Sequence, residues 1–317
     1  MDLQPGAVAV VGEALIDLVP RDQDGLYQAV PGGSPANVAV GLARLQVPAR
    51  MVARLADDPF GRRIRRHLAG NGVDLGGVVT AAEPTSLAIV DVDRDGGVSY
   101  DFRVDGTADW QWRDAELDRV LDGGLLALHS GSLALAMAPG ADALLRLLER
   151  ARGAVTISYD PNCRPLLMGS PERALERAER LVALADVVKA SVEDVAWLLP
   201  GRAAEEVAEA WLALGPALVA ITRGAEGVVA VAAGSGLLRR PARRVAVVDT
   251  VGAGDAFTSA LLAGLYRRGL LGAEHRAALR AVGEATLGEV LDEAVLAAGI
   301  TCTRRGADPP VLSELLG

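Results

Sequence analysis

The segment 249–257, with the sequence DTVGAGDAF, places two glycines and two carboxylates close together. An apolar run at 245–248 precedes it, and small and apolar residues that suit a helix follow from Ala253. Glycines let the backbone turn so tightly that successive N–H groups converge on an anion at the start of a helix. Asp255, in the first helical turn, would repel a phosphate that is only bound, but it could take a proton from a nucleophile attacking that phosphate. The pattern indicates phosphoryl transfer, although a plain helix cap would use the same glycines.

Three other glycine-containing motifs disagree with this chain in residue identity. A dinucleotide-binding turn requires glycine or alanine where Phe257 stands. A Walker loop requires a lysine after its second glycine, and no such loop surrounds the single lysine of the chain, Lys189. The segment 32–36 is close to a hydrolase nucleophile elbow, but Pro35 would remove a backbone N–H that an oxyanion hole needs. These mismatches favour the glycine turn as the chemical centre.

Short apolar runs alternate with helical patterns along most of the chain. We expect strands at 7–11, 51–55, 125–129, 155–159, 187–189, 218–221 and 245–248, and helices at 35–45, 62–69, 141–152, 172–184 and 256–267. Most of the apolar runs are continuous, as in strands that are buried on both faces of a parallel sheet. The order predicts a three-layer α/β/α fold with a mostly parallel central sheet. No repeat or linker divides the chain, so we expect one domain over residues 1–317.

Two segments, about 13–31 and 85–105, interrupt this alternation. The second predicts two strands around a turn at Asp95-Gly96-Gly97. Together the segments predict a small β-sheet, built from two separate parts of the chain and inserted in the domain. It could be a pair of surface hairpins, or it could be a lid that closes over a substrate and excludes water.

Composition limits the partners that such a site could serve. The chain has 32 lysines and arginines against 41 acidic residues, a net charge of −9, which disfavours nucleic acid and anionic membranes. Its two cysteines, Cys163 and Cys302, form no zinc or redox motif. The uncharged stretch 123–141 contains turn residues that favour a strand and a helix start over a membrane span. With no basic region at the N-terminus, we expect no signal peptide and a cytoplasmic protein with small-molecule partners.

Two segments resemble the signatures of a known family. Residues 249–265 resemble the C-terminal signature of the ribokinase-like (PfkB) carbohydrate kinases, and residues 32–39 resemble their N-terminal signature. The opening residues 12–17 and the ending residues 301–307 are also similar to those of the family. The segment 160–164 (DPNCR) is typical of the branch that holds fructokinases and 2-keto-3-deoxygluconate kinases. The resemblance implies a ribokinase-like fold with a β-sheet lid and ATP-dependent phosphorylation of a sugar hydroxyl, with Mg²⁺ required.

The resemblance also implies catalytic roles. Asp255 would be the general base, and the N–H groups of Gly252, Ala253 and Gly254 would hold the transferring phosphoryl group. The start of the helix is expected to keep Asp255 ionised. Arg164 would neutralise phosphate charge; a surface salt bridge is the less favoured alternative.

Sugar binding is assigned by the resemblance to Asp17, Gly32, Gly33 and Asn37, because a carboxylate and a carboxamide suit a polyol. Arg103, on the second predicted lid strand, could reach a sugar hydroxyl or carboxylate. Taken singly, Asn37 could be a helix cap, Asp17 a turn residue and Arg103 a solvated strand charge.

The nucleotide side of the resemblance is spread over several segments. The turn 222–227 matches a family turn around ribose and phosphate, although a simple turn between strands would have the same glycines. With few aromatic residues in the chain, we expect aliphatic side chains to hold adenine. The residues expected to bind ATP are Lys189, Ser191, Thr222, Gly224, Gly227, Val251, Val295 and Ala298.

Two cation sites follow from the same resemblance. Asp194 stands where the family usually has a glutamate near Mg²⁺ and its waters, and Glu193 is a neighbouring substitute. Asp249 and the carbonyl of Val251 are the expected K⁺ ligands.

The resemblance favours fructose or a related ketose as the substrate. The alternatives are 2-keto-3-deoxygluconate, whose carboxylate would need a cation such as Arg103 or Arg164, and, less favoured, a nucleoside. A sugar-binding regulator that has lost turnover is a further alternative. By analogy with the family, we expect a homodimer formed through the lid.

Overall fold

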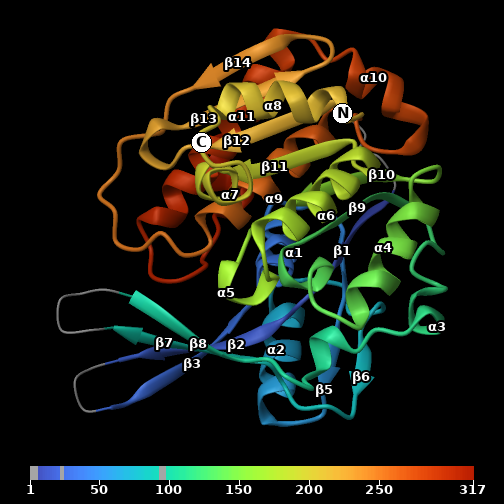
Figure 1. The fold of residues 1–317 in the computed structure, drawn as a ribbon. Coiled ribbons are helices and arrows are strands. Elements are labelled where there is room, and N and C mark those ends of the chain that lie inside the picture. The colour runs from blue at the N-terminus through green and yellow to red at the C-terminus, as the bar shows by residue number, and fades with distance from the viewer. Residues whose placement is uncertain (1–5, 22–24, 93–97) are drawn as a thin grey trace.

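A mixed sheet forms the centre of the protein, whose computed structural model describes residues 6–21, 25–92 and 98–317. In the described chain this sheet has eight strands in the order β14-β13-β12-β11-β10-β9-β1-β4 (Figure 1). The parallel strands are β1 (Ala7–Val11), β4 (Ala49–Val52), β9 (Leu125–Gly131), β10 (Thr156–Asp160), β11 (Val187–Ser191) and β12 (Leu218–Thr222). Strands β13 (Val228–Ala232) and β14 (Gly236–Arg240) continue the sheet in antiparallel fashion.

Helices cover both faces of this sheet, which confirms the predicted α/β/α layers (Figure 1). Val8 and Val10 of β1 belong to one hydrophobic core, while Ala9 and Val11 belong to the core on the other face. The first core includes residues of α1 (Ser34–Arg44), α2 (Pro59–Gly70), α9 (Ala253–Arg267) and α11 (Glu284–Cys302). The second includes residues of α4 (Gly140–Ala151), α6 (Pro171–Leu184), α7 (Val192–Leu198) and α8 (Ala204–Ala213). Burial on both faces explains why the parallel strands appear as continuous apolar runs.

Shorter elements complete the described chain. Strands β5 (Arg54–Ala56) and β6 (Val79–Ala81) pair with each other. The short helices are α3 (Asp114–Leu117), α5 (Pro165–Met168), α10 (Arg276–Arg280) and α12 (Leu312–Leu316). No helix of the described residues has the length and apolar character needed to cross a membrane.

A second sheet extends away from the main one (Figure 1). Its strand order is β3 (Tyr27–Gly32), β2 (Leu15–Pro20), β7 (Leu87–Val92) and β8 (Val98–Arg103). The outer pairs β2–β3 and β7–β8 are antiparallel, while β2 and β7 run parallel in the middle. The predicted turn at Asp95-Gly96-Gly97 lies outside the described residues. The structure thus contains a small separate sheet built from two distant parts of the chain.

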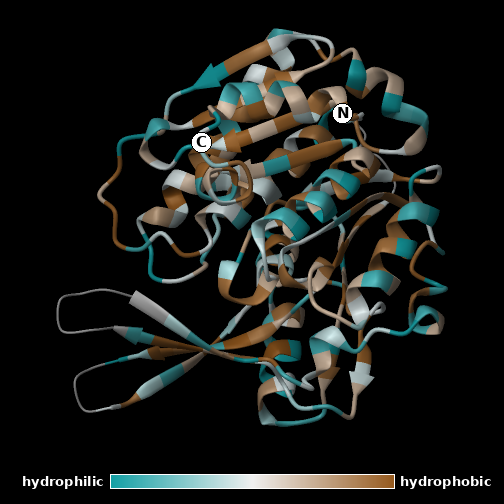
Figure 2. Cartoon of the chain, viewed as in Figure 1, coloured by the Kyte–Doolittle hydropathy of each residue, from teal (hydrophilic) through white to brown (hydrophobic). Residues whose placement is uncertain are grey.

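The prediction of a strand at 245–248 is wrong. This segment is an irregular connection on the surface, in which Val247 and Val248 are 63% and 58% exposed. Figure 2 shows its hydrophobic colour on the loop that joins β14 to α9. The edge of the sheet beyond β12 is instead filled by the β13–β14 hairpin, so no strand position remains for 245–248 beside β12.

Candidate active site

Helices α1 and α9 start at the same place, beside the carboxyl ends of the parallel strands. They pack closely because Gly41 lacks a side chain: a Cβ there would lie 2.3 Å from the hydroxyl oxygen of Ser259. Gly252 precedes α9 with a left-handed φ of 77°, which glycine adopts without strain. Open α/β sheets bind ligands at this end of their strands, and helix N-termini attract anions.

Asp255 lies between the two helix starts. Its carboxylate accepts a 2.6 Å hydrogen bond from the hydroxyl of Ser34 and a 2.8 Å bond from the amide nitrogen of Asn37. Burial raises the pKa of Asp255, while its two hydrogen bonds and the nearby cations Lys189 and Arg164 oppose that rise. Burial therefore has a larger effect on the pKa of this carboxyl than these hydrogen bonds and cations together. A carboxylate held in this way has free lone pairs for a further donor.

The backbone amides at the start of α9 differ in part from the expected anion hole. The N–H of Ala253 donates to the carbonyl of Thr250 at 3.2 Å, because the glycine turn closes on itself there. In the described residues, the N–H groups of Gly252, Gly254 and Asp255 have no hydrogen-bond acceptor. The open set therefore contains Asp255 in place of Ala253.

A buried ion pair lies directly beneath this turn. The ammonium of Lys189 is 3.0 Å from the carboxylate of Asp160, and both side chains are almost completely buried. A Cβ on Gly254 would lie 3.0 Å from the Lys189 nitrogen, so glycine lets the cation approach the turn closely. Burial lowers the pKa of Lys189, but Asp160 and Asp194 outweigh it and the net shift is upward. Lys189 stays charged and adds to the positive potential of the helix start.

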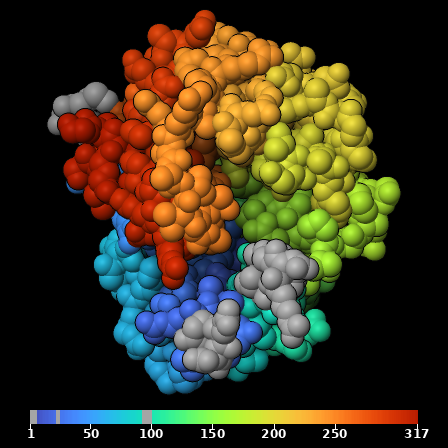
Figure 3. Space-filling model, turned by 90° about the vertical axis from the view of Figure 1, so that its left-hand side faces the viewer, coloured from blue at the N-terminus to red at the C-terminus, as the bar shows by residue number. Residues whose placement is uncertain are grey.

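Asp17 faces the same space from the small sheet. Gly32 lies diagonally across from it on β3, and a Cβ on that glycine would lie only 2.1 Å from a carboxylate oxygen of Asp17. Burial raises the pKa of Asp17 to about 6, Arg164 lowers it and Asp255 raises it. The structure therefore brings Asp17, Asp255 and Arg164 within electrostatic reach of one another. Figure 3 shows a hollow between the small sheet, in blue and teal, and the orange and red surface of the C-terminal half.

Gly33 and Arg164 complete the expected sugar and phosphate side. Gly33 has a φ of 99°, and a Cβ there would lie 2.7 Å from the carbonyl oxygen of Glu13. The guanidinium of Arg164 is exposed and donates to the carbonyl and the side-chain oxygen of Asn162, at 3.2 and 2.8 Å. Its hydrogen bonds are therefore local, and the group is accessible to a ligand.

Arg103 does not lie on the face that carries Asp17. Across the small sheet, Asp17 pairs with Ala88, which pairs with Phe102. Arg103 is one residue further along β8, so it faces the other way; it is 66% exposed and pairs with Asp101 at 2.6 Å. The expectation that Arg103 contacts the sugar is therefore corrected, because the alternation along β8 points it away.

An aromatic pair occupies the face that was expected to carry Arg103. The rings of Tyr100 and Phe102 stack with centroids 5.8 Å apart and an interplanar angle of 15°. Burial raises the pKa of Tyr100, and the carboxylates of Asp17 and Asp249 raise it further. Sequence reasoning missed these two residues, although aromatic side chains two positions apart on a predicted strand share a face.

The comparisons with known proteins concern the chain as a whole. The chain matches the pfkB family carbohydrate kinases over residues 6–314. It belongs to that family. A curated fructokinase from Klebsiella pneumoniae is 38% identical over 273 residues, which cover 84% of this chain and 86% of the relative.

Two solved structures extend the similarity to the whole fold. A fructokinase from Xylella fastidiosa with bound ATP has a TM-score of 0.89 and 29% identity, covering 98% of this chain and 97% of its own. A double-mutant fructokinase from Vibrio cholerae O395, in a form with fructose, ADP and potassium ion, has a TM-score of 0.82 and 29% identity, covering 99% and 96%. The pfkB family member described here is an ATP-dependent sugar kinase with a ribokinase-like fold.

The nucleotide residues expected in this pfkB kinase lie at strand ends and on the exposed connection. Ser191 ends β11 and Thr222 ends β12, where its hydroxyl donates to the carbonyl of Ala190 at 3.3 Å. Gly224 has a φ of 52° and open space around it. Gly227 has a φ of 95°, and a Cβ there would lie 2.0 Å from the carbonyl of Arg240. Both glycines thus have the positive φ angles that the turn requires, and the space next to Gly224 is open.

The aliphatic residues expected to hold adenine differ in accessibility. Val251 is 42% exposed, while Val295 of α11 is buried in the core. Ala298 is half-buried one turn further along α11. Val251 and Ala298 are therefore the accessible members of the expected group.

Asp194 has a structural role in the pfkB kinase. One oxygen accepts the N–H of Cys163 at 2.6 Å, and the other accepts the N–H and hydroxyl of Ser191, both at 2.8 Å. These bonds cap α7 and tie the segment after β10 to the end of β11. No cluster of three or more potential metal-ligating side chains occurs in the described parts of the chain. Asp194 thus does not fit a direct Mg²⁺ ligand, and Glu193 is exposed next to it.

Asp249 joins the two loops that flank the glycine turn. Its carboxylate accepts the N–H of Val251 at 3.0 Å and that of Gly306 at 2.8 Å. The carbonyl of Val251 accepts no hydrogen bond from any residue that the structure describes. A carboxylate and a free carbonyl oxygen are thus close together beside the start of α9.

Proposed function

We propose that the protein is a fructokinase, which transfers the γ-phosphoryl group of ATP to a hydroxyl of D-fructose. The names of its relatives support this substrate, as does the fructose in the Vibrio cholerae structure. The observation that carries the proposal is the Asp255 carboxylate, hydrogen-bonded to both Ser34 and Asn37 and adjacent to the open amides of α9.

Asp255 is the general base of the proposed reaction. The sugar hydroxyl donates to a free lone pair of its carboxylate, and its proton passes to Asp255 as the oxygen attacks the γ-phosphorus. The bond between the γ-phosphorus and the bridging oxygen of the β-phosphate breaks, and ADP leaves with that oxygen. Transition states of this kind are loose, so the proton leaves late and a carboxylate is basic enough. The donors Ser34 and Asn37 orient the carboxylate so that it needs no rearrangement at that moment.

The phosphate charge that develops is met by groups already in place. The N–H groups of Gly252, Gly254 and Asp255 lie at the start of α9 and would bind the transferring phosphoryl group. Lys189 adds a buried positive charge beneath them, and Arg164 supplies an exposed one at the rim. Such groups stabilise the transition state without reorganising, because the fold positions them beforehand.

The cations fit this site unequally. Asp249 and the carbonyl of Val251 suit K⁺, since oxygen atoms with one negative charge favour a monovalent cation; when bound, K⁺ would add positive charge beside the amides. The carboxylate of Asp194 is engaged by the chain, so Mg²⁺ would reach this site with ATP, and water molecules would separate it from Asp194 or Glu193.

The small sheet is proposed to act as a lid, formed by about 13–31 and 85–105 within one domain over 1–317. Its Tyr100 and Phe102 would cover the sugar and exclude water. The exposed apolar residues Val19 of β2, Leu26 just before β3 and Tyr27 of β3 support a homodimer formed through the lid.

A substrate panel tests the proposal. Release of ADP is measured with D-fructose, other ketoses, aldoses, 2-keto-3-deoxygluconate and nucleosides, and D-fructose is expected to have the highest kcat/KM. A preference for 2-keto-3-deoxygluconate or a nucleoside would replace fructose as the substrate. No ADP release with any sugar would indicate a sugar-binding regulator.

A further inference from the structure

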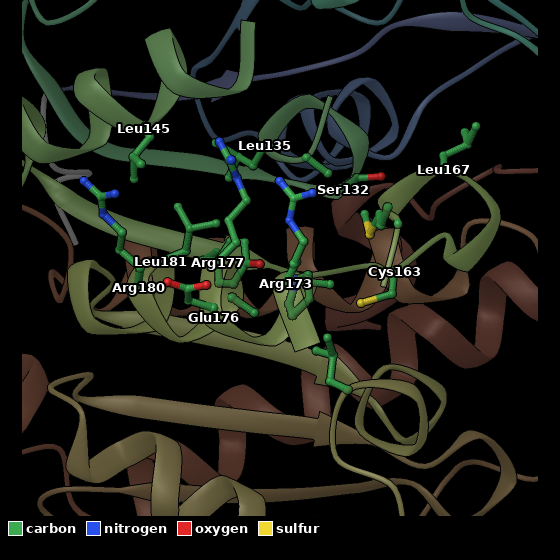
Figure 4. Close-up of a pocket in the computed structure, with 18 of the residues that line it drawn as sticks. Ser132, Leu135, Leu145, Cys163, Leu167, Arg173, Glu176, Arg177, Arg180 and Leu181 are labelled. Atoms are coloured by element: carbon green, nitrogen blue, oxygen red, sulfur yellow. The ribbon is translucent and has the colours of Figure 1, made fainter. Parts of the chain in front are cut away.

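A cavity of about 450 Å³ lies behind the segment that carries Arg164. Its walls come from α4, α6 and residues 161–170, and Figure 4 shows Arg173, Arg177 and Arg180 projecting from α6 across it toward Leu135 and Leu145. The volume falls in the range of small-molecule sites, about 300–1,000 Å³. The residues that line it include none of those that contact Asp255.

The cavity combines three arginines with an apolar wall, and the carboxylates of Asp142 and Glu176 line it as well. Arg177 pairs with Asp142 at 3.0 Å, and Arg180 pairs with Glu149 at 2.6 Å. The guanidinium of Arg173 has no ion pair with any described residue, and only its backbone N–H is engaged, by Ser170. The apolar lining is formed by Leu135, Leu145, Leu167, Met168, Leu181 and Leu198. A free guanidinium beside an apolar wall suits an anion that carries a carbon body.

Tyr159 gives a second, independent indication of a ligand. Its side chain is 95% buried and lines the cavity, yet its hydroxyl makes no hydrogen bond to a described residue. Burial raises the pKa of Tyr159, neighbouring acidic groups raise it further and Arg177 lowers it, so the hydroxyl stays neutral. A neutral hydroxyl in this position can donate a hydrogen bond to an anion, and that bond would give the buried hydroxyl a partner.

The same residues connect the cavity to the active site. Tyr159 directly precedes Asp160, the partner of Lys189, and Cys163 lines the cavity next to Arg164. Leu167 and Met168 of α5 line it too, and they pack against the same hydrophobic cluster as Phe102 of the small sheet. A ligand in the cavity would therefore contact the same segment, 161–170, that carries Arg164 at the active site.

We propose that this cavity is a second small-molecule site, which binds a compact organic anion. The phosphate or carboxylate group of the ligand contacts Arg173 and the Tyr159 hydroxyl, and its carbon body packs against the leucines. The proposal goes beyond the sugar kinase activity and does not rest on it, because binding is measured without turnover.

Phenyl phosphate and benzoate are suitable probes, titrated calorimetrically into the whole protein with a non-hydrolysable ATP analogue present. The analogue keeps the probes out of the anion site of α9. We expect Arg173→Gln to weaken binding by about tenfold or more, as loss of a charged hydrogen bond does. Ala174→Phe, which fills the cavity from α6, should abolish binding. Arg66→Gln, on an exposed face of α2, is the matched control and should leave it unchanged.

Alkylation of the two cysteines locates the bound probe. Phenyl phosphate should slow the modification of Cys163, which lines the cavity, and leave that of Cys302 unchanged. Tighter binding of phenyl phosphate than of benzoate assigns the site to phosphate esters, and the reverse order assigns it to carboxylates.

Absence of binding by both probes overturns the proposal. It is equally overturned if the probes bind with the same affinity to Arg173→Gln and Ala174→Phe, once thermal melting has shown that both variants fold. Unchanged alkylation of Cys163 on binding contradicts it as well. Failure of fructose phosphorylation leaves these results intact, so the two proposals fail separately.

Discussion

Replacing Asp255 with asparagine removes the proposed base and changes little else. Asparagine has the same shape, and its oxygen can still accept from Ser34; the contact with Asn37 then pairs two amide nitrogens unless one amide flips. Loss of one hydrogen bond costs about 1 kcal/mol, and removal of a partly buried charge offsets it, so the melting temperature should stay close to that of the wild type. Loss of general base catalysis should lower kcat by about 10²–10⁴, or roughly 3–5 kcal/mol.

The assay measures kcat from ADP release and the affinity for an ATP analogue by calorimetry. Burial raises the pKa of Asp255. Wild-type kcat should therefore fall as the pH decreases and Asp255 becomes protonated, and this acidic limb of the pH profile should be missing in Asp255→Asn. Asp118→Asn, an exposed carboxylate after α3, is the matched control. A kcat close to wild type in Asp255→Asn, with an unchanged pH profile, would refute the reasoning.

Three further results are expected. Lys189→Met should lower the free energy of unfolding by about 3–5 kcal/mol, measured with denaturant, because Asp160 then remains buried without its partner. Burial raises the pKa of Glu13 from 4.5 to about 7, so the folded state binds more protons than the unfolded state in this window and stability falls as pH rises through it. Glu13→Gln should remove up to about 3 kcal/mol of that decrease in stability. Thermal unfolding at several pH values measures the difference. Fructose phosphorylation should be faster in K⁺ than in tetramethylammonium, because Asp249 and Val251 suit only the smaller cation.

Each of these results has its control. Adding Asp160→Asn to Lys189→Met should recover part of the lost stability, and no recovery would contradict the role of the ion pair. Glu209→Gln, exposed on α8, should leave the pH dependence unchanged, whereas a flat wild-type profile would contradict the account of Glu13. Equal rates in the two cations would remove the K⁺ site.

The central strands could be predicted because their chemistry is local. A strand buried on both faces must be apolar throughout, and β1 matches its predicted bounds of 7–11. The run 245–248 has the same composition but lies on the surface, because the β13–β14 hairpin occupies the edge beside β12. Composition alone cannot tell whether a sheet position is left for an apolar run.

The site was predictable where it depends on backbone shape, and less so where it depends on which way a side chain faces. Gly252 and Gly33 have the positive φ angles that make glycine necessary. The face of β8 required the register across three strands, which puts Phe102 in line with Asp17 and turns Arg103 away. Ser34 was missed as a partner of Asp255, since the two are 221 residues apart in the chain.

The role of Asp194 was visible in the sequence but was not recognised. Ser191 and Asp194 have the serine-to-acid spacing of a capping box, in which each side chain binds the backbone of the other. In that pattern the carboxylate of Asp194 accepts hydrogen bonds at the start of α7, so fewer of its lone pairs are available to a metal ion.

A crystal structure with D-fructose and a non-hydrolysable ATP analogue tests the central claim most directly. The account predicts one fructose hydroxyl within about 3.2 Å of an Asp255 oxygen, on the line toward the γ-phosphate, with that phosphate on the amides of Gly254 and Asp255. A hydroxyl in line with the phosphate but nearest to another base, with Asp255 bonded only to Ser34 and Asn37, would contradict it.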